Sequence, residues 1–273
     1  MKKVSNRFFK RIQESISVAL LGANIYEKIR IFSVLIYRSF QHTLVRIPES
    51  SLNYTIPFHL SYNNTTFDVT LRSHEEVALL YEFFCRRVYH IQLSFEPQTI
   101  VDLGANTGIS TLFLHTLFPR AHIIAVEPNP KILPLLKERL TGIANSTLVH
   151  GAVSGSRGEV NFFVHQQSLS SSLTQRSSDV QKVKVPSITL RDILETYGSK
   201  GIDLLVFDIE GAEEFLLSNI EALTHVRAIL GEVHEDLIKI SLEQFLSALR
   251  EIYTIVIEPT KKKQRYIITG YKK

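Results

Sequence analysis

Short apolar runs alternate with helical stretches from residue 99 to the end of the chain. Five runs have the length and composition of buried parallel strands, at residues 99–103, 121–127, 147–153, 202–209 and 226–233. Helices are expected between them, near residues 109–118, 130–140, 189–197 and 211–222. Two further runs, 253–258 and 265–269, flank Pro259 and three lysines, which is typical of an antiparallel hairpin. The alternation predicts an α/β fold with a mostly parallel central sheet between helices and a closing hairpin.

The N-terminal segment, residues 1–50, has a different pattern. Apolar residues recur at helical spacing between Phe8 and Leu20, and residues 29–40 are apolar nearly all round. These runs are too short and too often interrupted by charge for a signal peptide or a spanning helix. Two interpretations stay open. The helices pack on protein, either the main domain or a second copy in a homo-oligomer, or they lie at an anionic membrane surface as a peripheral contact.

A second segment, residues 51–98, leads into the main domain. Alternating runs at 54–56 and 66–71 flank the turn residues Tyr62-Asn63-Asn64, which predicts a hairpin. Ser73 and Glu76 have the spacing of a capping box, so a helix is expected to follow. The chain is therefore divided into segments 1–50, 51–98 and 99–273.

Charge and cysteine content narrow the functional classes. The net charge of the 273 residues is +4, but the first fifty contain nine basic and three acidic residues, which leaves −2 for the rest. A main body without excess positive charge argues against nucleic acid as a partner. The single Cys85 excludes an intramolecular disulfide and a cysteine-based zinc site. These features favour a cytoplasmic protein, with membrane association left open.

The first predicted strand and the helix after it are joined by a glycine-containing turn with Gly104 and Gly108. Glu127 ends the second strand, 23 positions after Gly104, where a carboxylate can accept hydrogen bonds from a ribose. The dinucleotide-binding pattern needs glycine at 106 and 109, but this chain has Asn106 and Ile109. Asp102 could brace the turn or contact a cationic amino group. A nucleoside cofactor is indicated, and S-adenosylmethionine suits these residues better than a pyrophosphate.

Five segments resemble the FkbM family of class I S-adenosylmethionine-dependent methyltransferases, in the order the family has them. They are residues 101–108, 127–130, 151–154, 187–190 and 207–213. The resemblance spans roughly residues 73–258, and its most specific part is Asp208-x-Glu210-Gly211-Ala212-Glu213. It implies a Rossmann-like methyltransferase fold and methylation of a hydroxyl group on a sugar, glycan, lipid or natural-product-like acceptor. A noncatalytic nucleotide-binding or membrane-associated interaction module is the alternative.

The resemblance also implies roles for individual residues. The turn would surround the methionine part of the cofactor, Glu127 would bind ribose, and Asp208 would lie near the transferred methyl group. Ala152 and Val153 would lie near adenine. The expected cofactor-binding residues are therefore Asp102, Gly104, Ala105, Asn106, Gly108, Glu127, Pro128, Asn129, Ala152 and Val153.

Four polar residues follow or end the fourth and fifth strands: Asp208, Glu210, Glu232 and His234. The members of each pair are two positions apart, so they share a face while the strand continues. The carboxyl ends of parallel strands form the usual ligand site, so we expect these four residues to line the acceptor pocket as catalytic residues. They could act as a base or hold Mg²⁺.

Two neighbouring features are less specific. Glu213 and Glu214 are expected to begin the next helix, where negative charge is favourable. Residues 166–173 are polar and small, and could form a linker or an acceptor-side loop.

Overall fold

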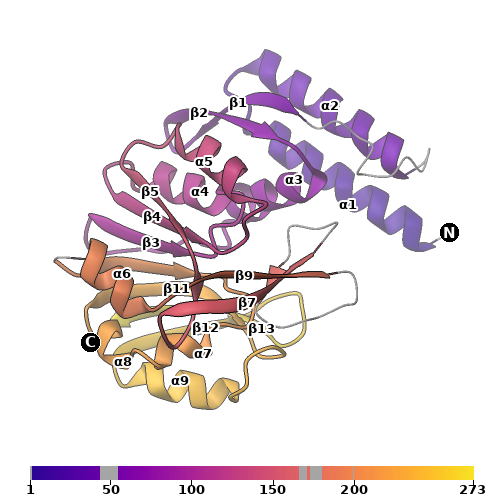
Figure 1. Ribbon diagram of the computed structural model, residues 1–273. Coiled ribbons are helices and arrows are strands. Elements are labelled where there is room, and N and C mark those ends of the chain that lie inside the picture. Colours follow the sequence, from indigo (N-terminus) through magenta and orange to yellow (C-terminus); the bar gives the residue numbers. More distant parts are fainter. Residues whose placement is uncertain (1, 44–54, 166–170, 173–179, 199) are drawn as a thin grey trace. The chain divides into compact units, whose positions relative to one another are not determined.

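The structure, a computed structural model, describes residues 2–43, 55–165, 171–172, 180–198 and 200–273 (Figure 1). The chain forms two compact units, Met1–His90 and Ile91–Lys273. The division falls inside the segment 51–98 expected from the sequence. The hairpin and helix of that segment therefore belong to the same unit as the N-terminal helices.

The first unit contains two long helices, a hairpin and a shorter helix. Helices α1 (Lys2–Ala19) and α2 (Ile25–Thr43) pack on each other, and β1 (Ile56–Tyr62) pairs antiparallel with β2 (Thr65–Leu71). Helix α3 (His74–Leu80) continues into the π-helical turn η2 (Tyr81–Cys85). The N-terminal helices, the hairpin and the following helix are thus confirmed. No helix in the described part of the chain has the length and apolar composition that crossing a membrane requires.

The second unit is built on a seven-stranded sheet with strand order β12-β13-β11-β10-β3-β4-β5. Its members are β3 (Thr99–Leu103), β4 (His122–Glu127), β5 (Ser146–His150), β10 (Ile202–Phe207), β11 (Val226–His234), β12 (Tyr253–Pro259) and β13 (Arg265–Lys272). Strand β13 pairs antiparallel with both β11 and β12, whereas the other neighbours are parallel. The predicted parallel sheet with a closing hairpin is confirmed.

Helices cover both faces of this sheet (Figure 1). Alternate strand residues such as Val101, Ile124 and Leu205 share a buried core with α6 (Leu190–Tyr197), α7 (Glu214–Leu217), α8 (Ile220–Leu223) and α9 (Leu242–Arg250). Helices α4 (Ile109–Leu117) and α5 (Leu133–Leu140) lie against the other face. Burial on both faces explains why the strands are almost continuously apolar.

The prediction of one strand over residues 147–153 is wrong. The main sheet ends with β5 at His150, and β6 (Ala152–Val153) belongs to a separate four-stranded sheet of order β6-β9-β7-β8. Gly151 lies between them, and its N–H donates to the carbonyl of Glu127. The other strands of that sheet are β7 (Gly158–His165), β8 (Ser171–Ser172) and β9 (Val180–Ile188). A Cβ at Gly151 would lie 3.1 Å from the Ile188 side chain, so the backbone passes close to β9 at this point.

Two other boundaries differ from the prediction. Strand β10 ends at Phe207 rather than at 209, and the helix expected over 211–222 is two short helices, because Asn219 leaves the helical conformation (φ −128°, ψ 43°). Of the polar segment 166–173, only Ser171 and Ser172 are described, in β8, so its expected role as a loop or linker lies mostly outside the described residues.

Candidate active site

The turn after β3 is held against its neighbours by backbone contacts. The N–H groups of Gly104 and Ala105 both donate to the carbonyl of Val126, at 2.9 and 3.0 Å. Gly104 has φ +83°, and a Cβ there would overlap the carbonyl oxygen of Asp208. Gly108 has φ +80°, and its Cβ would come within 2.8 Å of the Leu136 side chain. Both glycines are therefore required by backbone conformation and by close protein packing.

Asp102 braces this turn, which is one of the two roles expected for it. Its carboxylate oxygen Oδ2 accepts hydrogen bonds from Ser110 Oγ at 2.9 Å and from Thr111 Oγ1 at 2.6 Å. These bonds fasten the end of β3 to the first turn of α4. Burial raises the pKa of Asp102 to about 6, although the two hydroxyl groups oppose the shift. A contact with a cationic amino group stays a prediction.

Glu127 joins two loops at the carboxyl end of β4. Its Oε2 accepts from the Asn106 N–H and its Oε1 from the Asn129 N–H, both at 2.8 Å. Burial raises the pKa of Glu127 to about 7, against the effect of these two bonds. Each carboxylate oxygen keeps a second lone pair, so ribose hydroxyls could still be bound. Nearby, the hydroxyl of Thr107 is buried without a hydrogen-bond partner.

The remaining expected cofactor residues differ in what they can offer. The carbonyl of Pro128 lies 3.2 Å from the His150 ring nitrogen Nε2. The side chains of Ala152 and Val153 are buried in packed cores. A contact between either residue and adenine would therefore use main-chain atoms.

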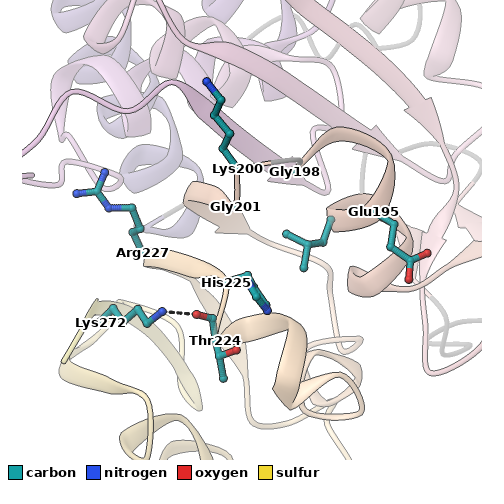
Figure 2. Close-up of a pocket in the computed structure, with 9 residues that line it drawn as sticks. Glu195, Gly198, Lys200, Gly201, Thr224, His225, Arg227 and Lys272 are labelled. Atoms are coloured by element: carbon teal, nitrogen blue, oxygen red, sulfur yellow. Dashed lines mark hydrogen bonds between the residues drawn. The ribbon is translucent and has the colours of Figure 1, made fainter.

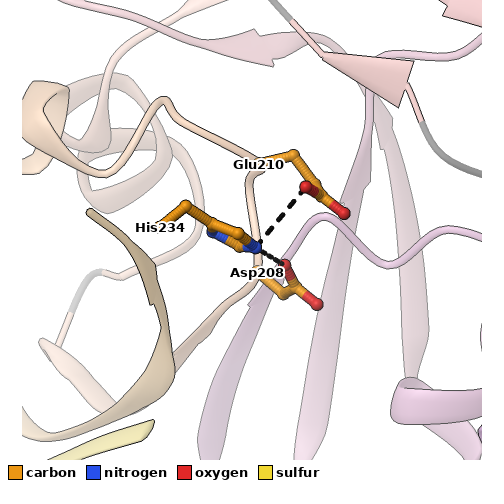
Figure 3. Close-up of side chains that lie close together, drawn as sticks. All are labelled: Asp208, Glu210 and His234. Atoms are coloured by element: carbon orange, nitrogen blue, oxygen red, sulfur yellow. Dashed lines mark ion pairs between the residues drawn. The ribbon is translucent and has the colours of Figure 1, made fainter. Parts of the chain in front are cut away.

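Asp208, Glu210 and His234 come together at the carboxyl edge of β10 and β11 (Figure 3). His234 Nε2 lies 3.4 Å from Asp208 Oδ1 and 3.4 Å from Glu210 Oε2. The first pair was expected to share a strand face, but β10 has already ended and Glu210 has φ +50°. The residues converge because the backbone turns after Phe207. The sequence predicted correctly that the three residues lie close together. The expected reason, a shared strand face for Asp208 and Glu210, is wrong.

The turn also sets Asp208 beside the glycine turn expected to bind the cofactor. The Asp208 N–H donates to the Leu103 carbonyl at 3.0 Å, and the Asp208 carbonyl occupies the space beside Gly104. Its side-chain oxygen Oδ1 is buried and accepts no hydrogen bond. The expected acceptor residues and the expected cofactor turn therefore meet at Asp208.

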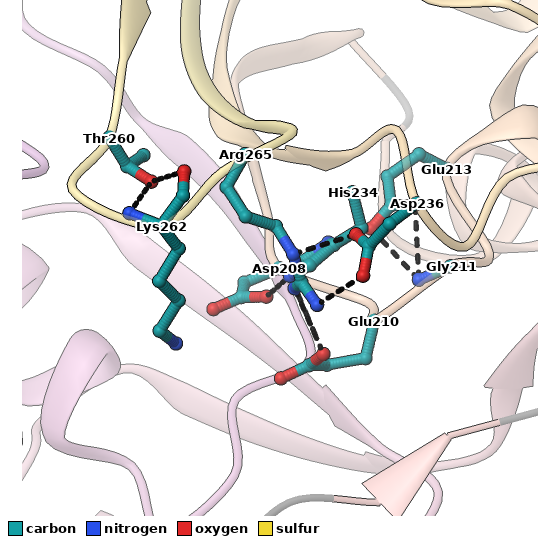
Figure 4. Close-up of polar contacts among 9 residues, drawn as sticks. All are labelled: Asp208, Glu210, Gly211, Glu213, His234, Asp236, Thr260, Lys262 and Arg265. Carbon is teal, nitrogen blue, oxygen red and sulfur yellow. Dashed lines mark hydrogen bonds and ion pairs between the residues drawn. The ribbon is translucent and has the colours of Figure 1, made fainter. Parts of the chain in front are cut away.

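Glu213 is the N-cap residue of α7, at the start of the next helix as the sequence predicted, and its side chain is also part of this cluster. Its side chain is fully buried, Oε1 lies 2.6 Å from His234 Nδ1, and both oxygens accept from the Gly211 N–H (Figure 4). Burial raises the pKa of Glu213 to about 7. Glu214 does begin α7, as predicted for it. The spacing between Asp208 and Glu213 was visible in the sequence, but the turn that buries Glu213 was not.

Arg265 is the functional candidate that the sequence analysis missed. The antiparallel register pairs His234 with Arg265, whose Nη1 lies 3.4 Å from Glu210 Oε2. Its Nε lies 2.8 Å from Asp236 Oδ1 (Figure 4). The strand containing Arg265 was predicted, but its register against β11 could not be read from the sequence alone.

Carboxylates outnumber cations in the cluster. Burial, followed by the charges of Glu210, Glu232 and Glu213, holds the pKa of Asp208 well above its ordinary value, and Lys262 opposes the shift. Glu232 therefore acts on Asp208 electrostatically, and its place in the acceptor pocket stays a prediction. The Asp208 side chain is 38% exposed and Glu210 is 26% exposed, whereas His234 is 1% exposed. A ligand from solvent would meet the two carboxylates before it met His234.

A separate cavity of about 600 Å³ lies near the amino ends of β10 and β11 (Figure 2). Three cationic residues line it, but two have protein partners: Arg227 pairs with Asp203 at 3.0 Å, and Lys272 donates to the Thr224 carbonyl. None of the expected site residues lines this cavity. It lies at the sheet edge opposite the usual ligand site of such folds.

Comparison with known proteins identifies the family. The profile described as "Methyltransferase FkbM domain" matches residues 102–266, more than half of the chain. The chain belongs to the FkbM methyltransferase family. The match begins at Asp102 and covers Glu127, Asp208 and His234. The predicted family and the predicted methyltransferase class are confirmed.

The names of two curated relatives describe methylation at oxygen. The chain is 25% identical over 150 residues to the 2-O-methyltransferase NoeI of Sinorhizobium fredii, an alignment covering 49% of this chain and 62% of NoeI. It is 24% identical over 196 residues to the 31-O-demethyl-FK506 methyltransferase FkbM of Streptomyces tacrolimicus, covering 59% and 75%. The chain thus spans less than two thirds of NoeI. Both names agree with the predicted O-methylation.

Among solved structures, the chain is similar to the fibrillarin pre-rRNA processing protein of Methanococcus jannaschii. The TM-score is 0.50 with 10% identity, over 81% of this chain and 85% of that protein. At this identity the likeness concerns the fold alone. The chain has the class I methyltransferase fold predicted for it.

Proposed function

We propose that the chain is an S-adenosylmethionine-dependent O-methyltransferase whose acceptor hydroxyl is bound at Asp208. This assignment depends on the position of Asp208. Its backbone is bonded to the end of β3 and packs beside Gly104, and its Oδ1 is buried and accepts no hydrogen bond. Membership of the FkbM family and the names of two relatives support oxygen as the methylated atom. The acceptor class is a hydroxyl-bearing small molecule, glycan or lipid.

The residues around the glycine turn fit the cofactor. The turn from Gly104 to Gly108 would hold the methionine part, and the free lone pairs of Glu127 would accept from the ribose hydroxyls. The buried Thr107 hydroxyl, which lacks a hydrogen-bond partner, is a further polar group available in this turn. When bound, S-adenosylmethionine supplies a methyl group on a positively charged sulfur. These are the residues we propose for binding it.

Asp208 would orient the acceptor and take its proton. The acceptor hydroxyl would donate to the exposed side of the Asp208 carboxylate, because Oδ1 is buried and faces His234 Nε2. With S-adenosylmethionine bound, its methyl group would pass to the acceptor oxygen, S-adenosylhomocysteine would leave, and the Asp208 carboxylate would take the hydroxyl proton. A positioned base of this kind contributes about 10²- to 10⁴-fold to the rate. Glu210, also partly exposed, would bind the acceptor beside Asp208.

His234 and Glu213 are better explained as positioning residues. His234 is almost fully covered, and the Glu213 carboxylate fixes its ring through Nδ1 at 2.6 Å. This leaves Nε2 directed at Asp208 and Glu210 (Figure 3). Glu213 would therefore fix the His234 ring so that Nε2 faces the two carboxylates of the proposed acceptor site.

Mg²⁺ assistance is the second candidate for this cluster. Asp208, Glu210 and His234 each offer one ligand atom, and the three atoms lie within 4.8 Å of one another. The 3.4 Å separations from Nε2 are longer than ordinary N–H···O hydrogen bonds, which are about 2.7–3.2 Å. A cation bound by the carboxylate oxygens could orient the acceptor oxygen in place of a direct hydrogen bond.

The cofactor half of the proposal is tested by calorimetry. We expect saturable binding of S-adenosylmethionine and S-adenosylhomocysteine, and no binding of nicotinamide dinucleotides. Glu127→Ala should weaken binding, because it removes the proposed ribose acceptor, whereas Glu243→Gln, which changes an exposed carboxylate paired with Arg250, should not. Dinucleotide binding without S-adenosylhomocysteine binding would contradict the proposal.

Whether activity depends on Mg²⁺ is tested separately. Once an acceptor is found, activity is measured after dialysis against EDTA and after addition of MgCl₂. Chelator-sensitive activity that Mg²⁺ restores would favour the cation, and activity indifferent to EDTA would favour the direct base. Loss of activity that no divalent cation restores would count against the Mg²⁺ site.

A further inference from the structure

The two N-terminal helices expose many large apolar side chains. On α1 and directly after its end these are Phe9, Ile16 and Leu20, which are 65%, 45% and 66% exposed. On α2 they are Ile25 (72%), Tyr26 (69%), Ile29 (61%), Phe32 (41%), Tyr37 (59%) and Phe40 (45%). Exposed apolar side chains that occur singly are ordinary, but a contiguous group marks an interaction surface.

The exposed side chains form stripes. On α2, Ile25, Ile29 and Phe32 are separated by four and three residues, which places them on one side of the helix. Ile31 and Leu35 occupy another side and are buried in the first unit. Helix α2 therefore has two apolar sides, and among the described residues of the first unit it is the side with Ile31 and Leu35 that is buried. At the end of α1, Ile16 and Leu20 have the same spacing.

The charge of the N-terminal region favours an anionic surface over a second copy of the chain as its partner. Residues 1–50 carry nine basic and three acidic side chains. In the described part, Glu14 is buried against Lys10 and His74, and Glu27 is bound by Arg30, so the acidic groups are already engaged. A second copy docking here would bring two strongly basic regions together. An anionic surface would instead be attracted.

We propose that α1 and α2 bind the surface of an anionic lipid bilayer, with their exposed apolar stripes inserted among the headgroups. Neither helix can cross the membrane, so the contact is peripheral. Exposed aromatic residues such as Tyr26 and Tyr37 suit the interface between water and lipid, where amphipathic rings are enriched. Binding of this kind combines apolar burial with attraction between basic side chains and anionic lipids. The inference stands independently of the proposed catalytic function.

The test uses the full chain and sedimentation with vesicles of phosphatidylcholine alone or containing 30% phosphatidylglycerol. We expect binding to the anionic vesicles at least tenfold tighter than to the neutral ones, and weaker at 1 M NaCl than at 0.1 M. The double variant Ile29→Gln/Phe32→Gln should lose at least tenfold in affinity. Val256→Gln, which changes a 50% exposed apolar residue on β12, is the matched control and should bind as the wild type does.

Light scattering separates this proposal from self-association. A monomer that binds anionic vesicles through the α2 stripe supports the proposal. Absence of vesicle binding, equal binding to neutral vesicles, or equal binding by the double variant would overturn it. So would a stable dimer that the double variant converts to monomer without a change in vesicle binding. Circular dichroism and thermal unfolding, measured in parallel, check that the variants are folded.

Discussion

Replacing Asp208 by Asn separates the contribution of this residue to turnover from its effect on the free energy of unfolding. The carboxylate lies among Glu210, Glu232 and Glu213, and its pKa is held above its ordinary value by burial and by their charges. The ionised side chain is therefore unfavourable in the folded protein. We expect Asp208→Asn to be more stable than the wild type at pH 8 and nearly inactive.

The size of the stability gain follows from the geometry. The ligand atoms of Asp208 and Glu210 lie within 4.8 Å, a separation at which two like charges repel by about 3 kcal/mol at an effective dielectric constant of 20 and about 1 kcal/mol in water. The lower value is the better guide, because Asp208 is 38% exposed and Lys262 offsets part of the repulsion. About 1 kcal/mol should raise the melting temperature by about 2–4 °C.

The assay is thermal unfolding between pH 4 and pH 8, together with turnover once an acceptor is identified. The folded-state pKa of Asp208 is raised, so the penalty appears as pH rises above the ordinary pKa, and the two proteins should differ least at pH 4. Turnover should fall about 10²- to 10⁴-fold while S-adenosylhomocysteine affinity is kept. The control is Glu221→Gln, whose carboxylate is exposed and paired with Arg191. An Asp208→Asn protein that melts lower at pH 8 and turns over like the wild type would refute the reasoning.

Three other changes test other parts of the structure. Gly104→Ala should destabilise the protein by about 2 kcal/mol or more in urea unfolding, because a Cβ would overlap the Asp208 carbonyl at positive φ; unchanged stability would contradict that packing. The pKa of Glu127 is raised to about 7, so the cofactor-free protein should lose about 3 kcal/mol of stability from this group as pH rises from about 4 to 8. Glu127→Gln should flatten that dependence in urea unfolding, and an identical pH slope in both proteins would rule the prediction out. Glu213→Gln removes the carboxylate that fixes the His234 ring, so turnover should fall about 10- to 100-fold and the pH–rate profile should shift. Cofactor affinity should stay the same. An unshifted profile at full turnover would show that Glu213 is only structural.

Much of the fold could be predicted because its patterns are local. The parallel strands are nearly continuous apolar runs, and the hairpin at the C-terminus is marked by Pro259 and its lysines. Helix α9 also had a readable signal, the capping box formed by Ser241 and Gln244, but it was not assigned from the sequence. The change of sheet at Gly151 was missed, because an apolar run gives no sign of which partner strand it will join.

The site was harder, since its residues are joined by backbone turns and by strand register. The positive φ of Glu210 and Gly211 reverses the chain, so that Glu213 lies behind His234 rather than on the surface of a helix. Arg265 reaches the cluster only through its pairing with His234 across two antiparallel strands. Neither relation follows from spacing along the chain.

Methyl transfer to a hydroxyl group at Asp208 can be followed with a labelled methyl group. The protein is incubated with cell extract and S-adenosylmethionine carrying a ¹³C-methyl group, beside Asp208→Asn at equal concentration, and labelled products are located by mass spectrometry and NMR. We expect a ¹³C methyl ether on a former hydroxyl group, formed by the wild type and nearly absent with the variant. Label on nitrogen or carbon, or equal labelling by both proteins, would contradict this expectation.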